Sequence, residues 1–278
     1  MTADENTPVK PCRLCGINPP IENSHILPRF VGKKAKKATG SQRLLTLTGK
    51  EKFQQDTLKL PFLCKQCEQR FGVLETQFAN QWFHCYPNHP PSEEIKEKVI
   101  RFYNSVAWRC LRFLMEKNAI PTISAQDAED TERFLRHHLH NETPAPPWNG
   151  YLFYASDFEN VPGAPPQELM RYAGGFAMVL FVNRTFLFEE PNRPAIISVI
   201  GPFIYVFELQ PSEAIENSDP EQWEGYRIGA GLVRSPKGPP PQQLTKWLTR
   251  ILCSPRDEYS DDEFPAFRLV DEEDDEED

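Results

Sequence analysis

The sequence predicts an α+β protein: a small metal-binding finger, then helices, then a mainly antiparallel sheet with a packed C-terminal helix. Three observations indicate this order. Two Cys-x-x-Cys pairs fall within the first 67 residues. Apolar residues then recur every three or four positions, which is the period of a helix. Beyond the proline-rich stretch 141–150 the sequence changes to short runs rich in β-branched and aromatic residues, which are typical of strands.

The two cysteine pairs have the spacing of a structural zinc site. Two intervening residues let a tight turn point both thiolates at one tetrahedral Zn²⁺. Gly16 follows the first pair, and the second pair runs directly into a predicted helix, which is the pattern of a treble-clef finger. A redox Cys-x-x-Cys would need a thioredoxin-like βαβ context, and the sequence lacks one. We therefore expect one structural zinc ion to organise residues 1–90 through Cys12, Cys15, Cys64 and Cys67.

The remaining cysteines and the lack of a membrane signal favour a cytoplasmic protein. Cys85, Cys110 and Cys253 stand alone among apolar residues, and we expect them to be buried thiols. Two metal-type pairs in an odd total of seven cysteines favour a reducing cytosol over a disulfide-bonded, secreted chain. No apolar run is long enough to span a membrane, and the polar first residues do not read as a secretory signal.

Charge is distributed unevenly along the chain. The formal net charge is −9, and residues 271–278 alone carry eight acidic side chains. Residues 1–80 contain thirteen Lys or Arg against seven Asp or Glu. A block of like charges is typical of disorder, so residues 263–278 are predicted to form an acidic disordered tail. The basic N-terminal part is suited to contact with phosphates.

Three helices are expected in the first half of the chain. The first begins near Cys67 and ends at the prolines 87, 90 and 91, with an apolar stripe through Phe71, Leu74, Phe78 and Trp82. The second begins at residue 92 and has so wide an apolar face that it should lie deep in the protein. The third covers residues 125–139. Its neighbouring histidines are expected at the surface: His137, His138 and His140.

The second half of the chain is predicted to be β-rich. Strands are expected at 151–155, 176–182, 185–188, 195–200 and 203–209. A fourth helix, with apolar residues between 244 and 252 on one side, should pack on the sheet. The predicted organisation is therefore a zinc-binding finger at 1–90, a helical segment at 91–142, a β-rich domain at 143–262 and the tail.

The segment between the cysteine pairs carries a resemblance to a known family. It contains Ser24-His25-Ile-Leu-Pro28, and Glu68 directly follows Cys67. These residues and the cysteine pairs resemble the HNH, or His-Me finger, endonucleases. Many of those enzymes have a strand ending in His-Ile-hydrophobic-Pro and a second strand entering a Cys-x-x-Cys at the head of a helix. The likeness covers residues 12 to about 84. A set of uncharacterised bacterial proteins is similar around His25, Asp56 and Glu68.

The resemblance implies that His25 is a general base that takes a proton from the water attacking a phosphodiester phosphorus. It also implies one Mg²⁺ or Mn²⁺ ion, held by a residue just before the base and by one at the head of the helix. Glu68 occupies the second place and is a suitable hard ligand. Ser24 occupies the first place and is a weak ligand when neutral. The usual Asn between the strands has no clear counterpart; Asp56 is a substitute and Glu75 a further candidate.

Each of these residues has a plainer interpretation that stays open. His25 suits a hydrogen-bonded structural role, Glu68 suits the first turn of a helix, and Asp56 suits a solvated loop. The cations after His25 are candidates for phosphate contacts in a flexible loop, or are merely solvated. These cations are Arg29, Lys33, Lys34, Lys36 and Lys37.

The implied function is that of a metal-dependent nuclease acting on DNA, or on RNA. By analogy with bacterial nucleases, it would suit defence against foreign DNA. The alternative is a non-catalytic zinc module that binds nucleic acid or protein and is regulated by the acidic tail. In either case the C-terminal domain or the tail is a candidate surface for a protein partner.

Overall fold

Helices and sheets both contribute to the fold, which confirms the α+β class predicted from the sequence. The computed structural model describes residues 10–39, 44–46, 52–54, 56–85, 93–118, 123–142, 149–154, 177–182, 195–209, 223–228, 231–236 and 245. Its helical elements are α1 (Arg29–Thr39), α2 (Lys65–Phe78), the π-helical turn η1 (Ala79–Phe83), α3 (Glu93–Glu116) and α4 (Ala125–Asn141). None of the described helices is both long and apolar enough to cross a membrane.

The largest sheet has six strands in the order β6-β7-β8-β5-β10-β9. Four of its five pairings are antiparallel, as expected, and the fifth, between β5 and β10, is parallel. Its strands are β5 (Asn149–Tyr154), β6 (Ala177–Val182), β7 (Ala195–Ile200), β8 (Phe203–Glu208), β9 (Trp223–Ile228) and β10 (Gly231–Pro236). The first four match predicted strands. The strand at 185–188, the helix at 244–252 except for residue 245, and the acidic tail lie outside the described residues.

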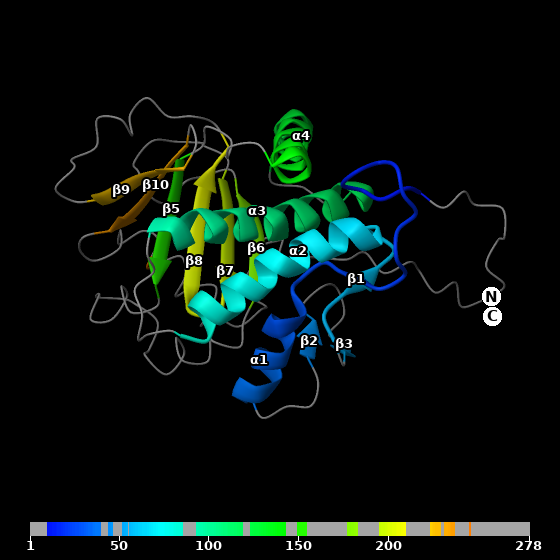
Figure 1. The fold of residues 1–278 in the computed structure, drawn as a ribbon, viewed down its shortest axis with the longest axis horizontal. Coiled ribbons are helices and arrows are strands. Elements are labelled where there is room, and N and C mark those ends of the chain that lie inside the picture. The colour runs from blue at the N-terminus through cyan, green and yellow to red at the C-terminus, as the bar shows by residue number, and fades with distance from the viewer. Residues whose placement is uncertain are drawn as a thin grey trace, which may run out of the picture.

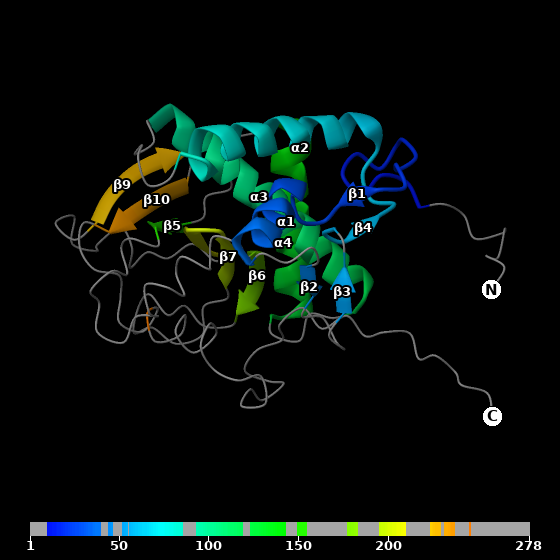
Figure 2. The same cartoon turned by 90° about the horizontal axis from the view of Figure 1, so that it is seen from below.

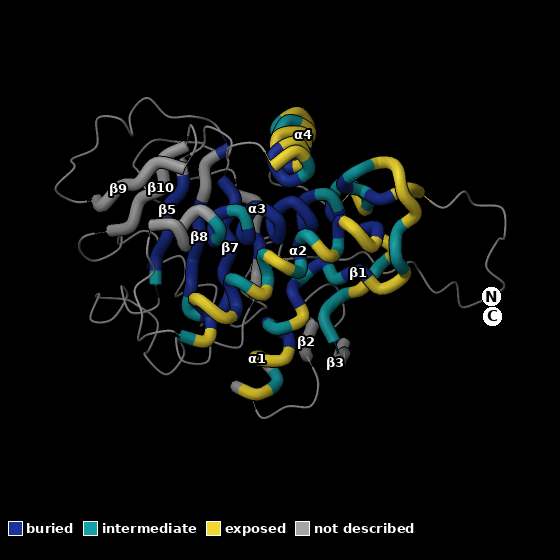
Figure 3. Tube along the Cα trace, in the orientation of Figure 1, coloured by how far each residue is buried: buried dark blue, intermediate teal, exposed yellow. Residues whose placement is uncertain are grey.

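The longest helix, α3, links the N-terminal part of the chain to the sheet. It contacts α2, α4, β6 and β7, and Figure 1 shows it running beside α2 and across the strands. Between Val99 and Leu114 most of its residues are buried, whereas α4 is exposed along its outer side (Figure 3). Phe62 and Phe71, from the N-terminal part, pack against Trp108 of α3, with ring centroids 5.6 and 6.0 Å apart. The deep position predicted for this helix is confirmed.

Buried apolar residues form one continuous cluster from Cys12 to Leu209. Aromatic rings fill its centre, where Phe78 of α2 stacks on Phe102 of α3 with centroids 4.0 Å apart. Gly201, in the turn between β7 and β8, has a positive φ of 58° and lies against the Phe83 ring of η1, where a Cβ would clash. The core of residues 12–84 is therefore shared with α3 and the six-stranded sheet, while the predicted boundaries near residues 90 and 142 stay predictions.

Two short strand pairs and α2 complete the N-terminal part. The strand β1 (Ser24–His25) pairs antiparallel with β4 (Lys59–Leu60), and β4 leads into α2. The second pair is β2 (Leu44–Thr46) with β3 (Lys52–Gln54). In Figure 2, α1, β2, β3 and the β1–β4 pair lie on the same side of α2. The path β1, β4, α2 is a ββα arrangement.

Three expectations need correction. The lysine-rich segment after His25 is the helix α1 and not a loop, because Ala and Lys favour helices and Pro28 is suited to a helix start. His138 is buried and not at the surface, since α4 turns this side of its last turns inward. Cys85 is half-buried, whereas Cys110 is fully buried as expected; Cys253 lies outside the described residues.

Candidate metal centre

The four paired cysteines meet at one point of the structure. The Sγ atoms of Cys12, Cys15, Cys64 and Cys67 all lie within 4.8 Å of one another, although 48 residues separate the two pairs. The Sγ atoms of Cys15 and Cys64 are 3.9 Å apart. Two sulfurs of a tetrahedron with metal–sulfur bonds of about 2.3 Å would be about 3.8 Å apart. Within the described residues no other group of three or more Cys, His, Asp or Glu converges in this way.

Backbone geometry places the first two thiols. The Gly16 N–H donates to the Cys12 carbonyl at 2.8 Å and closes a tight turn. Gly16 has a φ of +69°, in the left-handed region that glycine adopts without steric cost. The Cys12 N–H donates to the Asn18 carbonyl, which folds the chain back over the turn. Both thiols of the first pair therefore face the same side.

The second two thiols come from the start of α2. Cys64 is the residue before the helix, with an extended backbone, and its side chain makes no capping hydrogen bond. Its Sγ is therefore left for the cluster. Cys67 lies in the first turn of the helix and is buried. The two turns are joined by backbone hydrogen bonds from Arg13 N to the Phe62 carbonyl and from Ile21 N to the Leu63 carbonyl, at 3.0 and 2.8 Å.

The thiols differ in how readily they ionise. Burial raises the pKa of Cys12 and of Cys67, and neighbouring thiols raise the Cys67 pKa further. Burial also acts on Cys15, but the backbone N–H groups of Asn18 and Ile17 outweigh it and lower its pKa to about 7. A bound cation would supply the missing positive charge, because metal ligation requires thiolates. The chemistry of this donor set fits a metal ion.

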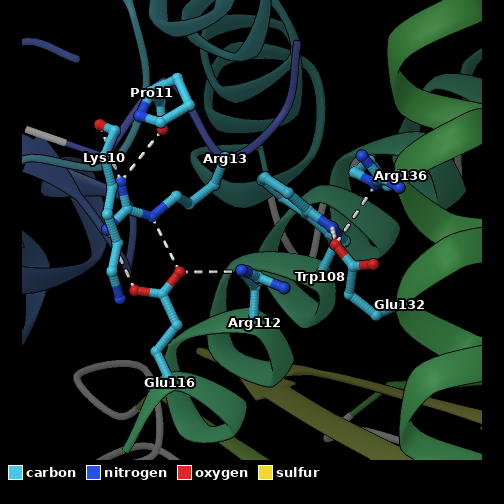
Figure 4. A network of polar contacts seen from close by, with 8 residues as sticks. All are labelled: Lys10, Pro11, Arg13, Trp108, Arg112, Glu116, Glu132 and Arg136. Atoms are coloured by element: carbon cyan, nitrogen blue, oxygen red, sulfur yellow. Dashed lines mark hydrogen bonds and ion pairs between the residues drawn. The ribbon is translucent and has the colours of Figure 1, made fainter. Parts of the chain in front are cut away.

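A salt bridge fastens the first cysteine turn to α3. Arg13, between Cys12 and Cys15, makes a bidentate contact with Glu116 at the end of α3 (Figure 4). The Nε–Oε1 and Nη2–Oε2 distances are 2.8 and 3.1 Å. Arg112 Nε lies 3.1 Å from the same Oε1. Arg13 lowers the Glu116 pKa, although burial acts in the opposite direction. The position of the cysteine cluster is therefore coupled to the long helix.

His25 lies next to Asp56, the residue proposed from sequence as a substitute for the usual Asn between the strands. Its Nε2 is 3.5 Å from Asp56 Oδ2, which is the long end of the hydrogen-bonding range. Lys59 Nζ lies 2.7 Å from the same oxygen, and the Thr57 N–H donates to the other. Burial acts to raise the Asp56 pKa, but these contacts lower it to about 2. Asp56 is therefore a carboxylate at neutral pH that can orient the imidazole.

Glu68 is engaged by Ser24 and not by His25. Ser24 is fully buried, and its Oγ donates to Glu68 Oε2 at 2.6 Å. Consecutive side chains of a strand point to opposite faces, so Ser24 turns towards α2 while His25 turns towards Asp56. The two positions that the HNH resemblance assigns to a metal ion, Ser24 and Glu68, are thus in contact. The imidazole lies with a different carboxylate.

Glu75, the further ligand candidate, is paired with an arginine that the sequence analysis did not single out. Arg109 Nη2 lies 2.9 Å from Glu75 Oε1 in an ion pair that lacks the angle of a hydrogen bond. The same guanidinium donates from Nη1 to the His25 carbonyl at 2.9 Å. The only sequence signal was a charged residue within the most apolar helix, where an unpaired arginine would be costly.

The cations proposed for phosphate contact all lie on α1, which begins four residues after His25. Arg29, Lys33, Lys34 and Lys37 are exposed, and Lys36 is half-buried. A helix carries these side chains at fixed spacing, whereas a loop would not. The arrangement gives a basic helical surface close in sequence to His25.

Comparison of the chain with models of protein families, with curated proteins and with solved structures finds no match. Function must therefore be argued from the arrangement of these side chains alone.

Proposed function

We propose that residues 12–84 form a treble-clef zinc finger of the HNH type and that the chain is a nuclease that hydrolyses phosphodiester bonds in DNA or RNA. The observation that carries this proposal is the meeting of a Cys₄ cluster with a ββα unit whose first strand bears His25 beside Asp56. Sulfur-only ligation in a closed site is typical of structural zinc, so Zn²⁺ is the metal proposed for the cluster.

His25 is the proposed general base. In the tautomer that is protonated at Nε2, the Nε2–H group donates a hydrogen bond to Asp56. The unprotonated Nδ1 can then accept a proton from water. Asp56 stays ionised at neutral pH and stabilises the imidazolium that forms. The water oxygen bonds to phosphorus as its proton passes to Nδ1, and the bond from phosphorus to the leaving oxygen breaks, with a solvent proton going to that oxygen. The cations of α1 hold the substrate backbone. Such backbone contacts give salt-dependent binding without base specificity.

A divalent ion is the proposed second metal. The described residues offer it two adjacent oxygens, the Ser24 hydroxyl and the Glu68 carboxylate, 2.6 Å apart. Mg²⁺ is commonly held by one or two carboxylates and completed by water and substrate phosphates, so Ser24 and Glu68 are the residues that would hold it. When bound, Mg²⁺ or Mn²⁺ would stabilise charge on the phosphate and the leaving oxygen.

The test is cleavage of supercoiled plasmid and of a labelled RNA by the full chain with Mg²⁺ or Mn²⁺. We expect nicking by the wild type and a loss of at least about 100-fold in His25→Ala, the lower end of what a general base contributes. His137→Ala is the matched control, because His137 is exposed and lies on α4, not on the elements β1, β4 and α1 that carry the proposed site. Equal, or equally absent, cleavage by wild type and His25→Ala would contradict the proposal.

A second candidate function is favoured by the Ser24–Glu68 hydrogen bond. Ser24 is buried and its hydroxyl already occupies Glu68, so both positions expected to bind the ion are engaged with each other. In that case the finger binds nucleic acid or protein without cutting, and the acidic tail competes for its basic surface. Binding would then survive His25→Ala, weaken with salt, and be lost in Cys64→Ser. Deletion of residues 263–278 would raise the affinity for DNA at low salt.

A further inference from the structure

Arg109 is the most deeply buried cation among the described residues of the helical layer. Its side chain is 1% exposed, in the middle of α3. Removing a guanidinium from water costs several kcal/mol unless its N–H groups are matched. A residue kept there at that cost is expected to do more than fill space, so its contacts indicate its role.

The contacts of Arg109 join three separate elements. Nη1 donates to the carbonyl of His25 in β1 at 2.9 Å, and Nη2 pairs with Glu75 of α2 at 2.9 Å. Nε donates to the Ser105 carbonyl within α3, at 3.2 Å, which fixes the stem of the side chain. The guanidinium also lies over the Phe71 ring, 5.3 Å from its centroid. The planar fork of arginine allows all of these contacts at once, which the single ammonium of lysine does not.

We infer that Arg109 is a positioning residue for the base: it holds the His25 peptide so that the imidazole faces Asp56. The strand β1 has two residues, which pair with the two of β4, and beyond it the Ile26 N–H donates to the Leu58 carbonyl at 3.0 Å. So short a pair does not by itself fix the direction of a side chain. The bond from Arg109 anchors the residue that bears the imidazole to a long, buried helix, while Glu75 fixes the other edge of the guanidinium. This role rests on the proposed nuclease function.

The sharpest test replaces both members of the Arg109–Glu75 ion pair, because replacing Arg109 alone would leave Glu75 without its partner. In Arg109→Met/Glu75→Met both charges are removed together, and such replacement of a buried ion pair by apolar residues is commonly tolerated. We expect this variant to keep one zinc per chain and to lose about 10- to 100-fold in kcat, with KM changed by less than about threefold, because a small misplacement of a reacting group costs that much. Arg112→Met is the matched control, since Arg112 lies one turn along α3, binds a carboxylate and does not touch β1.

A second readout is independent of cleavage. The ring ¹⁵N and ¹H signals of His25 report its tautomer and its contact with Asp56, and we expect them to change in the double variant and not in Arg112→Met. If the wild type cuts nothing, the proposed function fails, and these signals alone then decide the role of Arg109. Unchanged ring signals with kcat within twofold of wild type would overturn it. If the double variant does not load zinc, Arg109→Lys takes its place, with the same expectations.

Discussion

At the scale of single residues, Asp56 joins three groups through one carboxylate. One oxygen lies 2.7 Å from Lys59 Nζ and 3.5 Å from His25 Nε2, and the other accepts the N–H of Thr57. Lys59 lies in β4 and His25 in β1, and these two residues are also register partners in the strand pair. The carboxylate therefore reinforces the same pairing that its neighbours make through their backbones.

Asp56 should make stability depend on pH in the acid range. Its pKa is lowered from 3.8 to about 2 in the folded chain. A group whose folded pKa is depressed stabilises the protein above its unfolded pKa, and this contribution is lost as the pH falls from about 4 to about 2. Asp56→Asn should therefore cost about 1 kcal/mol or less at pH 7, given the partial exposure, and less still near pH 2. Urea unfolding at both pH values measures this, and an equal cost at both would contradict it.

The four thiols should not be exchangeable with the other cysteines. Cys64→Ser would remove one ligand of the proposed zinc site and leave three thiols. Loss of a structural metal ranks among the most destabilising changes, so we expect a cost above about 4 kcal/mol and less than one zinc per chain. Cys85→Ser is the control, because Cys85 is half-buried and outside the cluster. Elemental analysis and thermal unfolding measure the two effects; full zinc content in Cys64→Ser would refute the assignment.

The sequence predicted which thiols converge but not what the neighbouring polar side chains do. Cys-x-x-Cys spacing is local and occurs twice, so it predicts a shared metal site without knowledge of the fold. The direction in which Ser24 and His25 point depends on the pleat of a two-residue strand and on α3, which arrives about 80 residues later. For the same reason Arg109 could not be found from sequence: its partners are distant in the chain.

At the scale of elements, α4 shows how the unpaired backbone groups at the two ends of a helix find hydrogen-bonding partners. Ser124 precedes the helix, and its Oγ accepts the N–H of Asp127 at 3.0 Å. At the other end Arg70, from α2, donates to the carbonyls of Leu139 and His140 at 3.0 and 2.8 Å. Last-turn carbonyls have no partner within their own helix. Arg70 of α2 therefore satisfies two carbonyl groups at the end of α4 and links the two helices.

The start of α4 offers a simple test. Ser124→Ala removes the acceptor for the Asp127 N–H and should cost about 1 kcal/mol of unfolding free energy. Ser124→Asn restores an acceptor, and its amide can still donate to the Asp127 carboxylate that the Ser124 hydroxyl contacts at 2.6 Å, so it should cost a few tenths or nothing. Chemical unfolding of the two variants measures the difference, and equal destabilisation by both would mean that the cap does not contribute.

The contact between Arg13 and Glu116 should contribute more than a surface ion pair. It is two-pronged, with side chains 12% and 19% exposed, and it joins residues 103 positions apart. Hydrogen bonds between charged groups of this kind contribute roughly 1.5–3 kcal/mol. We expect a coupling energy of about 1 kcal/mol or more in a double-mutant cycle of Arg13→Ala and Glu116→Gln. The pair Arg133 and Asp130, exposed within one helix, is the control and should give less than about 0.5 kcal/mol.

Helices were easier to predict than strands. The apolar period of α3 and α4 repeats over several turns and gave both helices nearly to the residue. The strands β9 and β10 were missed because charged residues and glycines interrupt their apolar pattern, whereas the four predicted strands of the same length are more continuously apolar. The helix α1 was missed because four lysines indicated a solvated loop, although lysine is itself a good helix former.

At the scale of the whole molecule, metal binding should be felt beyond the finger. Arg13 and Arg109 connect the finger to α3, and buried apolar residues are continuous from Cys12 to Leu209. Removal of the metal with a chelator should therefore lower the hydrogen-exchange protection of α2 and of α3 together. Strands β7 and β8, which no cysteine turn contacts through a described hydrogen bond or salt bridge, should change least. Exchange loss confined to residues 12–20 would show that the finger is uncoupled.

The parallel pairing of β5 with β10 has a consequence for how the chain is completed. Among the described residues, β5 pairs on one side with β8 and on the other with β10, through Leu232, Val233 and Arg234. On a ribosome, a nascent chain that ends after β5 and before β10 would present an open strand edge on this side of β5. Such an edge is a template for intermolecular association. Truncations before residue 231 should therefore aggregate as they are synthesised, whereas chains long enough to add β10 should remain dispersed.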